Sequence, residues 1–179
     1  MAVRLGVLNV SDRASAGVYA DEPGQACVAL LREWLATPFE VDYRIVPDEV
    51  DVIAAELVRQ ADEAGCCLIV TTGGTGLAPT DRTPEMTARV VEFEVPGIAE
   101  AIRAYGVANG IATASLSRGI AGVAGSTLIV NLPGSMGGVK DGLQVLQAIV
   151  AHALDQLGGG DHERAADGGG GGHLSGGAG

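Results

Sequence analysis

Aromatic residues and lysine are scarce in this sequence. Aromatic side chains make up 3% of the 179 residues, whereas hydrophobic residues make up 47%. A folded core is therefore expected, and it must be built mainly from Val, Ile, Leu and Ala. Lys140 is the only lysine, and the formal net charge is −11. A chain with this negative charge repels phosphate backbones at long range, which argues against nucleic-acid binding. Local hydrogen-bond donors can still hold a small anion.

Long apolar runs and an N-terminal signal are also missing. No stretch of about 18 apolar residues occurs, so no membrane-spanning helix is expected. Arg4 lies inside the first apolar run, and no cleavage site follows it. Three cysteines occur, and the adjacent Cys66 and Cys67 would point to opposite faces of a strand. We therefore predict that these two and Cys27 are buried thiols of a protein in the reducing cytoplasm.

The composition divides the chain into a body over residues 1–157 and a glycine-rich tail over residues 158–179. Glycine has a large entropic cost of ordering, and the tail offers almost no apolar surface to bury. We expect a single folded domain followed by a flexible segment.

Apolar runs alternate with helical patterns along the body. Asp48 stands where the N-cap of a helix is expected, and Thr83 is predicted to cap another helix with Pro84 in its first turn. Residues 115–124 give no clear pattern. The predicted strands are 4–10, 39–46, 66–72 and 126–131, and the predicted helices are 24–36, 49–64, one opening at 83, one resuming after Pro96-Gly97 to about 107, and 138–157. This alternation predicts a three-layer α/β sandwich with a mainly parallel sheet.

Three unusual loops follow predicted strands. They are Ser11–Arg13, Thr71–Asp81 and Asn131–Ser135. In open α/β sheets, ligands bind at the carboxyl ends of the strands. We therefore expect a ligand site where these three loops converge.

The loop Thr71–Gly76 is rich in glycine. Glycines at 73, 74 and 76 would let backbone N–H groups approach phosphate oxygens, and the threonine hydroxyls add donors. The loop lacks the Gly-Lys-Ser/Thr of a P-loop, and it does not fit the spacing of a dinucleotide-binding fingerprint. Taken alone, it is equally compatible with a tight turn that binds nothing.

Two acids, Asp48 and Asp81, end loops at the same predicted edge. Magnesium bound to a nucleotide is typically held by one or two carboxylates together with phosphates and water. A helix cap would explain Asp48 equally well, and a turn would explain Asp81. The residues by themselves leave both interpretations open.

Five segments of the body resemble the Mog-type molybdopterin adenylyltransferases, a family that includes the gephyrin G domain and its plant counterpart. The segments are SDRASAGVY (11–19), TTGGTGLAPTDRTPE (71–85), EVPGIAEAIR (94–103), SLSRG (115–119) and VNLPGS (130–135). The resemblance covers residues from about 4 to 157.

The resemblance implies a molybdopterin-binding-domain-like fold, a homotrimer and a reaction. The terminal phosphate of molybdopterin would attack the α-phosphorus of ATP with Mg²⁺ as cofactor, giving adenylyl-molybdopterin and pyrophosphate. A separate molybdate-insertion protein is a further candidate partner. Asp48 and Asp81 match the family's two active-site acids, which would ligate the metal. The positions that match the substrate pocket are Ser11, Thr72, Gly73, Gly74, Thr75, Gly76, Ser117, Asn131, Pro133, Gly134 and Ser135.

Such a reaction joins two polyanions, so catalysis would consist mainly of positioning and charge neutralisation. Arg13, Arg82 and Arg118 are candidates for the positive charge. Some relatives carry lysine where this chain has Met136-Gly137-Gly138, which leaves a role for Lys140 open. A phosphate nucleophile is already ionised, so no catalytic histidine is needed.

Three alternatives remain. MoaB-like and competence-damage-type relatives share the glycine loop, and such a chain would be a pterin- or nucleotide-binding module without transferase activity. A NAD-dependent dehydrogenase needs a fingerprint that this loop lacks. A scaffold of the fused gephyrin kind is disfavoured by the short chain. The joint presence of Asp48 and Asp81 with the segments SDRAS (11–15) and NLPGS (131–135) favours the enzyme.

Overall fold

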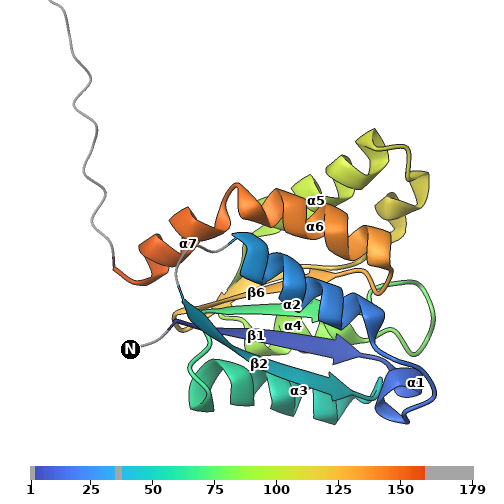
Figure 1. Ribbon diagram of the computed structural model, residues 1–179, viewed down its shortest axis with the longest axis horizontal. Coiled ribbons are helices and arrows are strands. Elements are labelled where there is room, and N and C mark those ends of the chain that lie inside the picture. Colours follow the sequence, from blue (N-terminus) through green and yellow to red (C-terminus); the bar gives the residue numbers. More distant parts are fainter. Residues whose placement is uncertain (1–2, 35–37, 160–179) are drawn as a thin grey trace, which may run out of the picture.

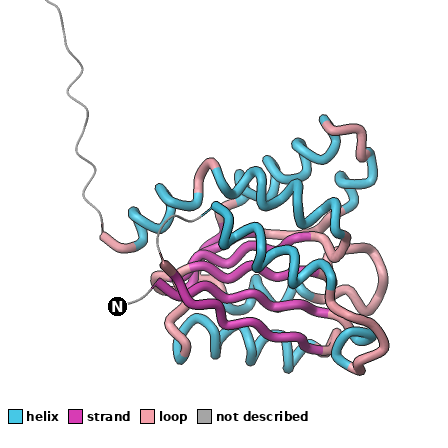
Figure 2. Tube along the Cα trace, in the orientation of Figure 1, coloured by secondary structure: helices cyan, strands magenta, loops and turns pink. Residues whose placement is uncertain are grey.

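The computed structural model describes residues 3–34 and 38–159, so the predicted tail lies outside the described residues from residue 160 onwards. One six-stranded sheet forms the middle of the fold, and helices cover both of its faces (Figures 1 and 2). The strands are β1 (Val3–Val10), β2 (Phe39–Val46), β3 (Leu68–Thr72), β4 (Phe93–Glu94), β5 (Ala121–Ala124) and β6 (Thr127–Leu132).

The sheet has the strand order β2-β1-β3-β6-β5-β4. Strands β2, β1, β3 and β6 are parallel, and β5 and β4 continue the sheet in antiparallel fashion. Thr72 at the end of β3 pairs with Asn9 of β1 on one side and with Leu132 of β6 on the other. The loops that follow these three strands therefore leave the same edge of the sheet.

Two helical layers enclose the sheet (Figure 1). One layer contains α2 (Glu22–Trp34), α5 (Pro96–Ala108), α6 (Met136–Gln147) and α7 (Val150–Leu157). The other contains α3 (Val50–Val58), which continues into a π-helical turn (Arg59–Glu63), and α4 (Thr83–Val90). Two short helices, α1 (Asp12–Ser15) and a 3-10 turn (Ala112–Leu116), lie in the loops. The three-layer α/β sandwich predicted from the sequence is confirmed.

Aliphatic side chains fill both interfaces between sheet and helices, as the composition predicted. Leu31 of α2 and Leu143 of α6 are buried against one face, and Ile53 and Leu57 of α3 against the other. The strands β3 and β6 are buried along their whole length, as expected for central parallel strands.

Several boundaries differ from the prediction. Strands β4 and β5 were not predicted, because they are only two and four residues long and contain no apolar alternation. The last helix begins at Met136 and is divided after Gln147. Asp48 and Thr83 were predicted as N-caps, but the caps are Glu49 and Arg82, and neither makes a side-chain capping bond.

Cys66 and Cys67 precede β3 and do not lie within it. All three cysteines are free thiols, and Cys27 and Cys66 are buried. Burial raises the pKa of Cys27 to about 12, so this thiol is unreactive at neutral pH. Within the part of the chain that the structure describes, no helix has the length and apolar character to cross a membrane.

Candidate active site

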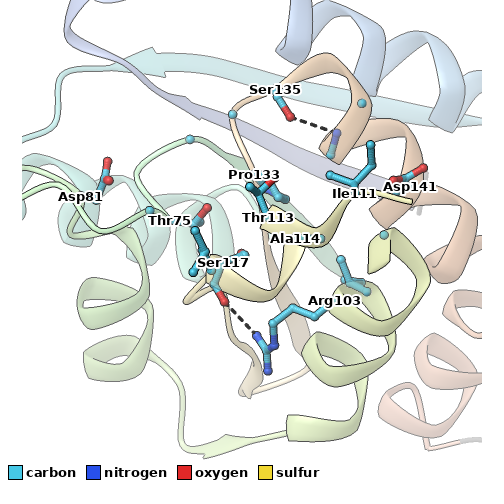
Figure 3. A pocket seen from close by; sticks show the side chains of 18 of the residues that line it. Thr75, Asp81, Arg103, Ile111, Thr113, Ala114, Ser117, Pro133, Ser135 and Asp141 are labelled. Atoms are coloured by element: carbon cyan, nitrogen blue, oxygen red, sulfur yellow. Dashed lines mark hydrogen bonds between the residues drawn. The ribbon is translucent and has the colours of Figure 1, made fainter. Parts of the chain in front are cut away.

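A cavity of about 510 Å³ opens at the carboxyl edge of the sheet (Figure 3). Its wall combines the loops after β3 and β6 with parts of α5, α6 and the 3-10 turn. The lining residues are Gly73, Gly74, Thr75, Gly76, Asp81, Ile102, Arg103, Gly106, Ile111, Thr113, Ala114, Leu116, Ser117, Pro133, Gly134, Ser135, Gly137, Gly138 and Asp141. Two of the three loops singled out from the sequence thus meet around one cavity.

The glycines of the loop after β3 are required by its backbone. Gly73 and Gly74 have φ angles of 91° and 63°, a region that side chains other than hydrogen disfavour. A Cβ at Gly73 would lie 2.2 Å from the carbonyl oxygen of Val10, and one at Gly74 would lie 2.2 Å from Oγ1 of Thr83. The loop therefore presents bare backbone to the cavity, as a phosphate-binding loop requires.

The loop after β6 lies directly against this glycine loop. A Cβ on Gly134 would stand 3.0 Å from Cα of Gly73. Ser135 caps α6, because its hydroxyl accepts a hydrogen bond from the N–H of Gly138 at 3.1 Å. The first turn of this twelve-residue helix contributes Gly137 and Gly138 to the cavity wall. Free N–H groups and the positive end of the helix dipole favour an anion there.

Asp81 lines the cavity, and Asp48 lies behind the glycine loop. The Asp81 carboxylate accepts the N–H of Ala78 at 3.0 Å. A Cβ on Gly74 would stand 3.2 Å from Oδ1 of Asp48, so only a glycine leaves room between that carboxylate and the loop. Burial raises the pKa of Asp48. The hydrogen bond from the N–H of Asp12 lowers this pKa, and the negative charges of Asp12 and Asp81 raise it. The two predicted acids are therefore close enough to interact electrostatically.

Arg118 holds the loop and does not project a free charge. Its Nε donates to the carbonyl of Gly76 at 2.7 Å, and its Nη2 donates to the carbonyl of Asp81 at 2.6 Å. Its remaining terminal nitrogen is hydrogen-bonded to Glu85. Although burial raises the pKa of Glu85, the hydrogen bond and charge of Arg118 lower it overall.

The other candidates for positive charge lie outside the cavity wall. Arg13 stacks over the ring of Tyr19 at 4.8 Å from its centroid, and the exposed Arg82 donates to the carbonyl of Pro79. Lys140 is exposed and does not line the cavity. Among the described residues that line the cavity, the only cation is Arg103, which the sequence analysis missed.

Most of the predicted substrate residues line the cavity, but three do not. Those that do are Gly73, Gly74, Thr75, Gly76, Ser117, Pro133, Gly134 and Ser135. Thr72 is buried and donates to Asn9. Asn131 is buried, and its side-chain amide bonds to Thr71 and Thr87 on neighbouring elements. Ser11 caps α1 through the N–H of Ala14. These three side chains hold the loops in place.

Arg103 and Asp141 are cavity residues that the sequence analysis did not identify. Arg103 of α5 donates to the carbonyl of Gly119 at 2.9 Å and, more weakly, to that of Ser117 at 3.4 Å (Figure 3). Asp141 is in the second turn of α6. The packing of α5 against α6 brings both residues to the cavity, and this contact between distant segments cannot be read from the sequence around either residue.

Residues 6–152 match the family model described as "Probable molybdopterin binding domain". The chain belongs to this family. A molybdopterin adenylyltransferase of Helicobacter pylori strain J99 is 41% identical over 155 residues, which are 87% of this chain and 88% of that protein. The solved structure of the molybdopterin biosynthesis Mog protein from Mycobacterium ulcerans is 46% identical, with a TM-score of 0.80, and the match covers 87% of this chain and 99% of the other.

A second structural relative has a different name. The molybdopterin biosynthesis enzyme MoaB from Thermus thermophilus is also 46% identical, with a TM-score of 0.77, and the match covers 88% of this chain and 97% of the other. The family resemblance found in the sequence is therefore confirmed. The identity values do not favour the Mog over the MoaB branch of the family.

Proposed function

We propose that this protein transfers AMP from ATP to the terminal phosphate of molybdopterin in the synthesis of the molybdenum cofactor. The observation that carries the proposal is the cavity itself, where the glycine loop, the N-terminus of α6 and Asp81 meet in a family member. The names of relatives at 41% identity support the same activity.

The reaction needs two anionic substrates held in line. An oxygen of the molybdopterin phosphate forms a bond to the α-phosphorus of ATP, and the bond from that phosphorus to the bridging oxygen of the β-phosphate breaks, so pyrophosphate leaves. The backbone N–H groups of the glycine loop and of the first turn of α6 suit such phosphates. Arg103 is the one cationic side chain among the described residues that line the cavity, and two of its guanidinium nitrogens donate to no carbonyl. Positioning of this kind supplies most of the catalysis in phosphoryl chemistry.

The acids fit a magnesium ion that arrives with the nucleotide. Within residues 3–34 and 38–159, no three acidic, histidine or cysteine side chains gather as a preformed metal site. Two interacting carboxylates, Asp48 and Asp81, are nevertheless what Mg²⁺ normally takes from a protein, the other ligands being phosphates and water. When bound, the ion would neutralise phosphate charge in the transition state. The chain's own part is to hold the Asp48 carboxylate beside Gly74 and the Asp81 carboxylate beside Gly76.

The MoaB-named structural relative makes a second candidate worth testing, a binding module that holds pterin or nucleotide without transferring AMP. Incubation of the purified protein with molybdopterin, ATP and Mg²⁺ separates the two functions. The transferase yields adenylyl-molybdopterin, detected by mass, and a chelator abolishes it. A binding module yields no such product but still retains either ligand.

We also propose the homotrimer, the cytoplasmic location and docking of a molybdate-insertion protein that the family resemblance implies. The free thiols at Cys27, Cys66 and Cys67 support a reducing compartment. Analytical ultracentrifugation at micromolar concentration tests the trimer, and a single species of monomer mass would reject it.

A further inference from the structure

One charged side chain in the cavity is not used by the proposed chemistry. Figure 3 shows Asp81 and Asp141 on opposite sides of the cavity. The loop that holds Asp81 belongs to the phosphate-binding end. The Asp141 carboxylate is half-buried, and in the part of the chain that the structure describes it makes no hydrogen bond and no ion pair. A carboxylate placed in this way is free to accept hydrogen bonds from a ligand.

The surface around Asp141 is largely apolar and suits a flat ring. Ile102, Ile111 and Ala114 line this part of the cavity. Gly106 is buried between them, and a Cβ there would stand 2.6 Å from Cβ of Ala114 and 3.7 Å from Oδ2 of Asp141. Thr113 also lines the cavity. Apolar walls with a few convergent polar groups are usual in a site that orients a heterocycle.

The donor pattern of the two substrates decides which ring belongs there. The pyrimidine ring of a pterin carries N3–H beside the 2-amino group, so two adjacent donors can meet the two oxygens of one carboxylate. Adenine carries its amino group beside N1, an acceptor, whose lone pair a carboxylate repels. Paired hydrogen bonds to an ionised carboxylate are among the strong ones.

We propose that Asp141 recognises the pterin ring through its N3–H and its 2-amino group. This inference rests on the proposed function, because it takes molybdopterin as the substrate of this cavity. It gives the cavity a direction: the pterin ring lies against α5 and α6, and the reacting phosphates lie over the glycine loop near Asp81. Asp141 is then the residue that selects a pterin over other flat rings.

The test compares two probes that differ at one edge of the ring, 6-hydroxymethylpterin phosphate and 6-hydroxymethyllumazine phosphate; in the lumazine a carbonyl oxygen replaces the 2-amino group and N1 carries a hydrogen. Their affinities, together with that of ATP, are measured by titration for wild type and Asp141→Asn. An amide can accept only one of the two donors, so the variant should bind the pterin about tenfold or more weaker. Its affinities for the lumazine and for ATP should stay within about twofold of wild type.

Asp155→Asn is the matched control, because the substitution removes the same charge. Asp155 is exposed on α7 and does not line the cavity. It should leave all three affinities unchanged, and thermal unfolding checks that both variants are folded. Equal binding of pterin and lumazine by wild type, or a loss of ATP affinity in Asp141→Asn, would overturn the assignment. These binding readouts need no turnover. If wild type forms no adenylyl product but still binds the pterin more tightly than the lumazine, the proposed function is wrong and the role of Asp141 in pterin binding stands.

Discussion

Asp48 and Asp12 are joined by a reciprocal pair of hydrogen bonds between the loops that follow β2 and β1. The N–H of Asp48 donates to Oδ1 of Asp12 at 2.8 Å, and the N–H of Asp12 donates to Oδ2 of Asp48 at 3.2 Å. The contacts fix the backbone of both loops, but they also bring two carboxylates together. The arrangement keeps Asp48 in place at the expense of electrostatic repulsion, as is common at functional sites.

Because burial of Asp48 disfavours its charged form, Asp48→Asn should make the metal-free protein at least as stable as wild type at neutral pH, while adenylylation slows by about 100-fold or more. Folding raises the pKa of Asp48 above its ordinary 3.8, so the folded state favours the protonated carboxyl. Its contribution to stability is then complete below pH 3.8 and is lost as the pH rises through the raised pKa. At pH 7 the free energy of unfolding of the variant should be equal to or higher than that of wild type. The difference should vanish in acid.

Denaturant unfolding at several pH values without Mg²⁺ measures this effect, beside an adenylylation assay. The assay should show a loss of about 100-fold or more. The exposed Asp51 at the start of α3 offers a control, since Asp51→Asn should change the free energy of unfolding by less than about 0.5 kcal/mol and leave activity intact. A clear destabilisation of Asp48→Asn at pH 7 would show that the hydrogen bond to the Asp48 carboxylate outweighs the cost of burying its charge.

Gly74→Ala should damage both the fold and the loop. The residue has φ +63°, and its new Cβ would stand 2.2 Å from the buried Oγ1 of Thr83. We expect the free energy of unfolding to fall by about 1–3 kcal/mol. Gly97→Ala is the control, because nothing lies within 4 Å of its Cβ and it sits in the first turn of α5, so it should be neutral or stabilising by up to about 1 kcal/mol. Equal stability of the two variants would contradict the account of the loop.

Arg118→Lys should loosen the glycine loop without unfolding the protein. Lysine keeps the charge, but it cannot bond the carbonyls of Gly76 and Asp81 and the carboxylate of Glu85 together. Amide hydrogen exchange should quicken over residues 74–83, and adenylylation should fall about tenfold through less accurate positioning. Unchanged exchange in that segment would show that Arg118 is not what holds it.

The sequence was sufficient to predict the layers and most of the cavity. The continuous apolar runs of β3 and β6 and the glycines after them are local signals, and they identified the loops correctly. Arg103 and Asp141 could not be found in this way, because they are 38 positions apart by number and meet only when α5 packs beside α6. The function of Arg118 was equally hidden, since two of its three partners are backbone carbonyls, which no sequence pattern reports.

Asp81→Asn separates binding from chemistry. Asparagine keeps the size of the side chain and can still accept the N–H of Ala78, so the fold should be intact. Molybdopterin affinity should stay close to that of wild type, whereas a single turnover of adenylylation should slow by about 100-fold or more. A rate within a few-fold of wild type would return Asp81 to the role of a turn residue.

The central claim is that an AMP group moves from ATP to molybdopterin, and labelled ATP tests it most directly. The purified protein is incubated with molybdopterin, Mg²⁺ and ATP carrying ³²P at either the α- or the γ-phosphate. We predict that the α-label appears in a pterin product and the γ-label in pyrophosphate, that both appear about 100-fold or more slowly in Asp81→Asn, and that neither appears with a chelator. Recovery of both labels in intact ATP, or release of the γ-label as free phosphate without a labelled pterin, would contradict it.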